Sequence, residues 1–502
     1  MGDGGVLPGH MRQNTEPPLW LFNPPTTSAF NASWANYGLW MSFLALGSLS
    51  LVLISGVLGD IFGRRRVMLI GLVGLLVANV LAIIAPTPPV LLVSRVIASI
   101  FGPLVLPLSL SILFLAFADD ELARSRALAV FVLLTNTAVL TAGLLGQLMN
   151  TLLDYRGMFL VSTVLALVAI VFIWRETTES RVPQDRRVDV VGHAAWALTV
   201  LLMMASLVAW RIDRPNARLA ATLSLIGVAI GVAFLVWWDR RTPDSIFGYS
   251  QIKRRALIVL ILYGACMQFG FVGLATQIRN TLQAVYGYHV VLATLALTPL
   301  LLGMAFTVFY ATRRLTTVRA QPLLAASLAI GALVSLLVVL TNAGASYPWL
   351  ALLLLVFGAV MVIANVTWTA VFFLAMPDDV VGVRTGINSS VFQLGGTIGG
   401  SVTAALLVDI GLSFYRQLLL VGGVPGDRIP DALAALNTIL DPATPSAVLD
   451  PAIAERLLAG YQLAYLMAFN RVILLIAAVC AVGSILVWYA LPRLQPAKAV
   501  EQ

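Results

Sequence analysis

The sequence predicts an all-α protein that crosses a membrane many times, and three observations support this fold class. The 502 residues are 60% hydrophobic and only 11% charged, with a mean hydropathy of +0.93. A soluble domain keeps roughly 25% charged residues, because it must cover its core with a wet surface. Long uncharged stretches recur along the chain, each close to the ~20 residues that a helix needs to cross the hydrocarbon core. They are continuously apolar rather than alternating, which favours helices over a β-barrel.

We expect thirteen membrane spans. Residues 1–36 are interpreted as a polar, proline-rich tail, and residues 492–502 as a second tail. Residues 409–469 are interpreted as one long hydrophilic insertion with a short helix at 451–461. The predicted spans are 37–58, 67–85, 90–117, 127–149, 157–174, 191–210, 219–238, 256–274, 291–311, 322–341, 348–375, 385–408 and 470–491.

The distribution of basic residues predicts the orientation of these spans. Loops on the side of residues 59–66 hold about twice as many Arg and Lys residues as loops on the other side. Under the positive-inside rule this bias places residues 59–66 and the C-terminus in the cytoplasm and the N-terminus outside. The net charge of +8 therefore records topology, and we expect no nucleic-acid partner.

The chain carries no recognisable catalytic, metal-binding or nucleotide-binding motif. Cys266 and Cys480 both lie inside apolar stretches, and His10, His193 and His289 are far apart in the sequence. The metalloprotease, nucleophile-elbow and P-loop patterns are all missing. We therefore expect neither an enzyme nor a cofactor, and no transport driven by ATP within this chain.

The segment between the first two predicted spans is the most informative one. It reads Gly56-Val-Leu-Gly-Asp60-Ile-Phe-Gly63-Arg64-Arg65-Arg66. Spans joined by so few residues need a tight turn, which glycine permits. Asp60 can accept hydrogen bonds from helix N-terminal amides or pair with an arginine. An ordinary positively charged loop is the alternative that these residues leave open.

This segment resembles the G-x-L-x-D-x-x-G-R-[RK] motif of the major facilitator superfamily. Five further segments resemble, in order, the fourteen-helix drug:proton antiporter branch of that superfamily. They are residues 155–159, 189–192, 234–243, 283–288 and 386–399. The resemblance implies helical bundles at residues 37–174 and 256–491, joined through two linking helices within residues 175–255. The distribution of basic residues places the insertion 409–469 outside.

The resemblance also implies a function. Substrate would bind at the midplane between the bundles, and their rocking would expose it to each side in turn. We expect a secondary transporter of the bacterial plasma membrane that exports amphipathic small molecules, with bilayer lipids around it and protons as a candidate coupling ion. Gly56, Asp60, Gly63, Arg64 and Arg65 would form an inner gating loop (residues 56–66) that stabilises one access state. The oligomeric state stays open.

Several features depart from the family pattern. The span at 37–58 aligns with the family's second helix, so the first is missing through a misplaced start or a true thirteen-span topology. No Asp or Glu falls in the middle of a predicted span, so the sequence does not support proton coupling directly. Residues 142–147 lack the proline of the antiporter motif. These departures leave a rival interpretation, a non-transporting scaffold that uses the segment 409–469 as an external binding module.

The remaining candidate site residues are polar groups within or beside the spans. Arg95 lies inside an apolar span, where a charge normally faces a cavity or a partner; snorkelling to the headgroups is the alternative. Gln277, Arg279 and Gln283 could line a cavity mouth or an exposed loop. Asn388 is a mid-span polar group that could line the pathway or bond across helices. The predicted translocation pathway comprises Arg95, Gln277, Arg279, Gln283 and Asn388.

Overall fold

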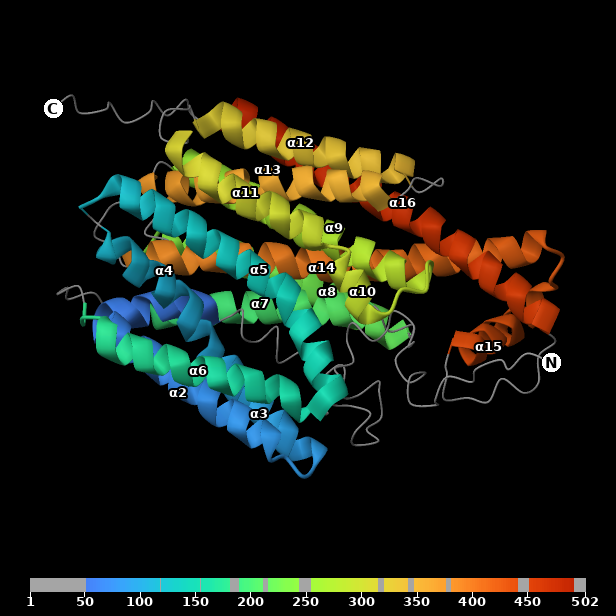
Figure 1. Cartoon of the computed structure of the whole chain (residues 1–502), viewed down its shortest axis with the longest axis horizontal. Coiled ribbons are helices and arrows are strands. Elements are labelled where there is room, and N and C mark those ends of the chain that lie inside the picture. Colours follow the sequence, from blue (N-terminus) through green and yellow to red (C-terminus); the bar gives the residue numbers. More distant parts are fainter. Residues whose placement is uncertain are drawn as a thin grey trace, which may run out of the picture.

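The computed structural model describes residues 51–117, 119–153, 155–180, 189–210, 215–242, 254–314, 320–341, 347–375, 381–440 and 451–491. These ranges form helices and connecting turns and contain no strand (Figure 1). The predicted tails at 1–36 and 492–502, and the first part of the span at 37–58, lie outside them.

A helix at Leu51–Phe62 precedes the labelled elements. These are α2 (Arg64–Ile83), α3 (Pro88–Phe101), η4 (Gly102–Leu104), α4 (Val105–Ala116), α5 (Glu121–Leu153), α6 (Arg156–Glu176), α7 (Val190–Trp210), α8 (Pro215–Asp239), α9 (Arg254–Ala284), α10 (Val290–Leu295), α11 (Thr298–Arg314), α12 (Ala320–Thr341), α13 (Tyr347–Leu374), α14 (Val381–Val421), η6 (Gly426–Arg428), α15 (Ile429–Leu440) and α16 (Pro451–Ala490).

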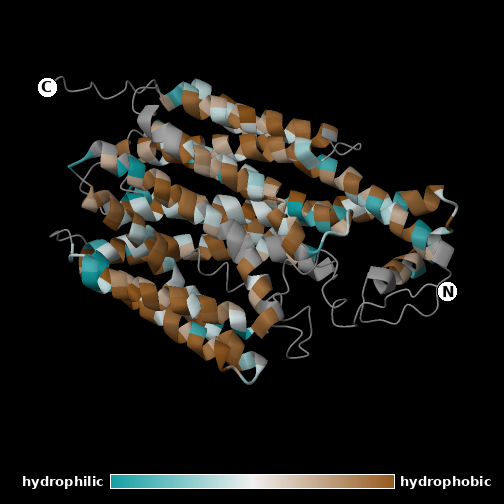
Figure 2. Cartoon of the chain, in the orientation of Figure 1, coloured by the Kyte–Doolittle hydropathy of each residue, from teal (hydrophilic) through white to brown (hydrophobic). Residues whose placement is uncertain are grey.

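The helices confirm the predicted fold class of a multi-pass membrane protein. Within the described ranges, ten helical stretches are long and apolar enough to cross a membrane. Three shorter apolar helices, Leu51–Phe62, Arg126–Thr135 and Val190–Met203, coincide with the other predicted spans. Hydrophobic residues dominate the shafts of the helices, and hydrophilic residues gather towards their ends (Figure 2). This distribution suits a bilayer, whose core can hydrate neither charges nor free backbone groups.

The helices pack as two bundles and one pair. In the first bundle α2 contacts α3, α4 and α6. In the second, α9 packs on α14 and α16, while α12 packs on α13 and α16. The linking helices α7 and α8 pack mainly on each other. Between the bundles, α5 contacts α10, α11 and α13, and α4 contacts α14. Any movement of one bundle against the other must therefore change the contacts that α4 and α5 make with α10, α11, α13 and α14.

One predicted span is interrupted. The span at 90–117 is divided into α3, a 3₁₀ turn and α4. Pro103 lies in that turn, and proline cannot donate the backbone hydrogen bond that a continuous helix needs. The break lies just before α4, whose residues Leu106 and Leu110 face the second bundle.

The segment 409–469 differs from the predicted hydrophilic insertion. α14 continues through it to Val421, and the helix predicted at 451–461 is only the first part of the 40-residue α16. Asp409 and Arg416 interrupt the apolar run, but a charge can end a membrane span without ending a helix. At about 1.5 Å per residue each helix is about 60 Å long, twice the ~30 Å hydrocarbon core. Both helices extend past the others at one end, beside α15 (Figure 1).

Candidate gate and substrate cavity

The gating loop begins with a turn that only glycine tolerates well. Gly63 follows the helix Leu51–Phe62 and has φ +99°, in the left-handed region. A side chain would be strained there. α2 starts at the next residue, so the turn brings Arg64 back over the end of the preceding helix.

A buried ion pair closes this turn. The Arg64 guanidinium lies 2.6 Å from the Asp60 carboxylate, and the exposed fractions of the two side chains are 2% and 12%. Removing one partner of such a pair leaves an uncompensated buried charge and costs about 3–5 kcal/mol. The arginine that was predicted to pair with Asp60 is thus Arg64, on the other side of the turn.

Asp60 also reaches the second bundle. Its other carboxylate oxygen accepts a hydrogen bond of 3.0 Å from the backbone N–H of Gly382. Gly382 is the second residue of α14, so its amide is one of the helix-terminal groups that have no partner within the helix. A carboxylate there also interacts favourably with the helix dipole. One side chain therefore joins the turn of the first bundle to the start of α14.

Two glycines let the backbones approach at this contact. A Cβ added to Gly56 would lie 1.8 Å from the carbonyl oxygen of Gly382, and a Cβ added to Gly382 would lie 2.2 Å from that of Gly56. Real side chains do not reach such distances, so the approach requires glycine in both helices. Gly56, which the sequence places in the gating loop, thus makes its close contact with a residue 326 positions later in the chain.

An aromatic stack reinforces the same junction. Phe114, near the end of α4, stacks on Phe373, near the end of α13, with ring centroids 3.9 Å apart and planes 5° apart. The Arg124 guanidinium lies 5.9 Å from the centroid of Phe114. Stacked rings add about 0.5–1.5 kcal/mol beyond the apolar area that they bury. In this structure the two bundles are closed against each other at the gating-loop end.

The segment after α6 holds the other side of the loop. The Glu179 carboxylate accepts hydrogen bonds from the backbone N–H groups of Arg65 and Arg66, at 3.1 and 3.2 Å. The Ser180 carbonyl accepts another from the N–H of Arg64, at 3.0 Å. Gly63, before α2, has no side chain with which to cap the helix, so Glu179 supplies a cap from elsewhere in the chain. The Arg65 guanidinium donates to the carbonyl of Trp174.

A cavity lies a short way along α14 from this gate. About 350 Å³ of empty space, which includes space open to solvent, lies between α4 and α5 of the first bundle and α13 and α14 of the second. Its lining residues are Leu106, Leu110, Leu128, Phe131, Val132, Thr135, Asn365, Thr369, Asn388, Ser389 and Phe392. Both bundles thus contribute to one mostly apolar chamber with a few neutral polar groups.

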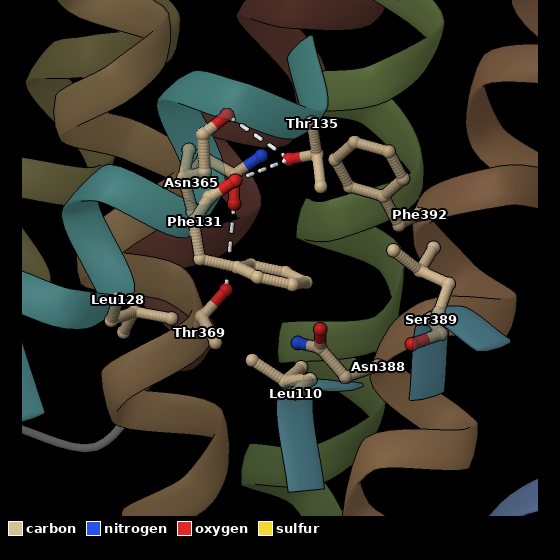
Figure 3. A pocket seen from close by; sticks show the side chains of 11 residues that line it. Leu110, Leu128, Phe131, Thr135, Asn365, Thr369, Asn388, Ser389 and Phe392 are labelled. Atoms are coloured by element: carbon tan, nitrogen blue, oxygen red, sulfur yellow. Dashed lines mark hydrogen bonds between the residues drawn. The ribbon is translucent and has the colours of Figure 1, made fainter. Parts of the chain in front are cut away.

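The polar groups of the chamber differ in what they are bonded to. The hydroxyl of Thr135 donates to carbonyls of its own helix, those of Phe131 and Val132, at 2.9 and 3.0 Å. The hydroxyl of Thr369 donates to Asn365 at 3.4 Å. The amide nitrogen of Asn388 has no partner within the described residues, although the side chain is only 5% exposed. Figure 3 shows the amide turned into the chamber, with its oxygen on the side of Phe131 and its nitrogen pointing between Thr369 and Leu110.

Arg95 lies within the first bundle, apart from this chamber. Its guanidinium is 4.4 Å from the ring centroid of Phe159 on α6, and it donates to Asn79 on α2 at 3.5 Å. Arg95 is thus partly buried among α2, α3 and α6. This agrees with the expectation that a charge within a span faces a partner. Its predicted place in the pathway stays a prediction.

The other predicted pathway residues lie on α9. Gln277 is fully buried and donates to the Thr403 hydroxyl on α14 at 2.9 Å, which makes it a link within the second bundle. Gln283 donates to the carbonyl of Arg279 at 3.4 Å. All three residues are helical, and none lines the chamber.

Of the predicted pathway residues only Asn388 lines the chamber, and its role in transport stays a prediction; sequence reasoning missed the polar residues around it. Thr135, Thr369 and Ser389 look like ordinary small polar residues, and only the assembled helices bring them together. Glu179 was also missed. Its only signal was an acidic residue soon after a span, and its partners lie more than 110 residues earlier.

Comparisons with known proteins agree on the kind of protein this is. The model of the Major Facilitator Superfamily matches residues 17–400, beginning inside the predicted tail. The puromycin resistance protein pur8 of Streptomyces alboniger is 27% identical over 392 residues, which are 74% of this chain and 75% of that protein. The multidrug efflux pump LfrA of Mycolicibacterium smegmatis is 27% identical over 83% of this chain and 81% of the pump. The fold is shared with the human organic anion transporter MFSD10, at a TM-score of 0.55 and 16% identity, over 94% of this chain and 97% of that one.

Proposed function

This chain belongs to the major facilitator superfamily, and we propose that it exports amphipathic small molecules as a secondary transporter. It is a transporter rather than an enzyme. One observation carries the proposal: the chamber lies between the two bundles, next to a closed contact between them. A guest there would touch both bundles, so their relative movement would change its exposure. The names of the two sequence relatives, a resistance protein and an efflux pump, support export.

The proposal also assigns the gate to one side of the membrane. The excess of arginines around the gating loop favours a cytoplasmic location for it and for the C-terminus, in a plasma membrane. The contacts of Asp60 with Arg64 and Gly382 would then hold the transporter shut towards the cytoplasm. Arg65 and Gly63 contribute by fixing the turn that presents Asp60. Opening to the cytoplasm would require the hydrogen bond from Gly382 and the Phe114–Phe373 stack to break.

The test is transport by the purified chain in proteoliposomes, with a panel of amphipathic compounds followed by radiotracer and a pH-sensitive dye inside. We expect a compound of the panel to accumulate when a pH gradient is imposed. The transport rate should fall by about tenfold or more in Asp60→Asn, because Arg64 then stays buried without its anion. Asp409→Asn, an exposed position on α14, is the matched control and should transport normally.

The same assay tests proton coupling. Among the described carboxylates, Asp60 is the one that lies buried where the two bundles meet. A proton flux that depends on substrate and is lost in Asp60→Asn would show that transport is coupled to protons. Substrate movement without proton flux would leave export intact and exclude this coupling. No substrate movement at all would refute the proposal and favour the scaffold interpretation.

A further inference from the structure

We propose that the chamber selects neutral molecules that carry a hydrogen-bond acceptor, and that the amide of Asn388 recognises this acceptor. The inference rests on the proposed function, because it names the class of substrate for that site. It narrows the amphipathic small molecules of that proposal to neutral ones.

The first argument is the hydrogen-bonding state of the chamber. The hydroxyls of Thr135 and Thr369 already donate to protein oxygens. Among the residues that the structure describes, none accepts a hydrogen bond from the nitrogen of Asn388, and this residue is more than nine-tenths buried. A buried donor without an acceptor is destabilising, so a guest oxygen that reaches it gains more than it would in water. In Figure 3 the nitrogen points into the space between Thr369 and Leu110, so a guest oxygen bound to it would lie among the residues that line the chamber.

The second argument is charge. None of the lining residues is ionisable, and none of the chain's Asp or Glu residues is among them. A cation that left water for this chamber would lose its hydration without meeting a carboxylate. The nearest ionisable residue on α14 is itself a cation, the buried Arg384, four residues before Asn388 and hence on the same face of the helix.

The third argument is shape and polarity. Apolar residues form most of the wall, and the rings of Phe131 and Phe392 both line it. A largely apolar guest with one carbonyl, ether or nitro oxygen would bury its hydrocarbon part against this wall and direct its oxygen at Asn388. Few but well-placed polar groups are what fix orientation and selectivity in apolar ligand sites.

The experiment measures binding to the full chain in detergent by calorimetry. The probes are chloramphenicol, a neutral amide, and tetraphenylphosphonium, a lipophilic cation. We expect the wild-type chain to bind chloramphenicol at least roughly tenfold more tightly. Asn388→Leu has a side chain of similar volume. It should lower the affinity for chloramphenicol by about tenfold, the usual scale of one buried hydrogen bond, and leave the affinity for the cation unchanged.

The decisive variant is Asn388→Asp, which adds the missing carboxylate. We expect it to bind tetraphenylphosphonium roughly tenfold more tightly than the wild type does. Gln417→Glu, the same change of amide to carboxylate at an exposed position on α14, is the matched control and should gain nothing. If Asn388→Asp does not fold, Ser389→Asp on the same wall replaces it.

Three outcomes would overturn the inference: a wild-type chain that binds the cation as tightly as the amide, an aspartate variant that gains no cation binding, or a wild type that binds neither probe. The proposed function fails separately, when no compound of the proteoliposome panel is moved. A chain that moves cations but not chloramphenicol would keep the proposed function and lose this inference.

Discussion

The gate and the chamber share one helix but are built in opposite ways. Gly382 and Asn388 are six residues apart on α14, about 9 Å along its axis. At the gate, glycine backbones touch, an ion pair is buried and carboxylates cap two helix ends. In the chamber, α14 presents neutral side chains and an amide nitrogen that has no partner among the described residues. The gate therefore tolerates almost no change in volume, whereas we propose that the chamber accepts a guest. Effects of substitution should be large and independent of ligand at the gate, and smaller and ligand-specific in the chamber.

The largest effect is expected from Gly56→Ala. The added methyl group would overlap the carbonyl oxygen of Gly382, so the helices must separate and the gate cannot close. Strain of about 3 kcal/mol would lower transport by roughly two orders of magnitude. Radiotracer export from proteoliposomes measures it. Gly411→Ala on α14, where the new Cβ would meet Ala468 at an ordinary 3.6 Å, is the control and should retain transport. Normal export by Gly56→Ala would mean that closure at this point is not needed.

A smaller effect is expected from Glu179→Ala. Losing the cap on α2 costs about 1 kcal/mol, which would raise the population with an open gate roughly fivefold. The reporter is Ser389→Cys in a chain with Cys266→Ala and Cys480→Ala, labelled from the gating-loop side by a membrane-impermeant maleimide. Labelling should accelerate in Glu179→Ala but not in Glu176→Ala, an exposed position at the end of α6. Equal labelling rates in both would show that the loop holds its shape without this carboxylate.

The smallest effect on transport is expected from Arg95→Gln, because Arg95 lies in neither region. The change removes its cation–π contact with Phe159, and the free energy of unfolding should fall by about 1 kcal/mol. Substrate affinity should stay within about twofold, since this energy is lost equally with and without ligand. Thermal unfolding and calorimetric binding measure the two quantities, with Arg416→Gln as an exposed control. A large loss of affinity would return Arg95 to the pathway.

The same contrast explains what sequence reasoning could reach. The gating loop was predictable because Gly56, Asp60, Gly63 and Arg64 lie within one short segment with a recognisable turn. Their partners Gly382 and Glu179 were not, because pairings across more than a hundred residues leave no local trace. The chamber was harder still, since four helices each contribute neutral residues that any membrane helix could carry. Asn388 stood out only as an amide in an apolar run.

The prediction of membrane spans succeeded for a related reason. Apolar runs are local, so the spans were found, and their ends were judged by charge. A charged residue was taken as the end of a span, and this criterion failed where the helix continues past the charge. Asp409 ends the apolar run, but α14 continues to Val421, and much of the segment 409–469 consists of the extended ends of α14 and α16. Helix length beyond the bilayer depends on packing, such as that of Tyr415 on Tyr461, whose ring planes lie 84° apart.

That extension has a practical consequence, because α14 is a single rod from the gate through the chamber to its far tip. A tilt of about 5° at the Gly382 end would displace Val421 by roughly 5 Å, given a length of about 60 Å. A spin label or fluorophore on the protruding tip would therefore register events at the opposite face of the bilayer, without any probe entering the transport route. An antibody fragment raised against the tip could likewise trap one orientation of the rod, and so serve to sort molecules by conformation.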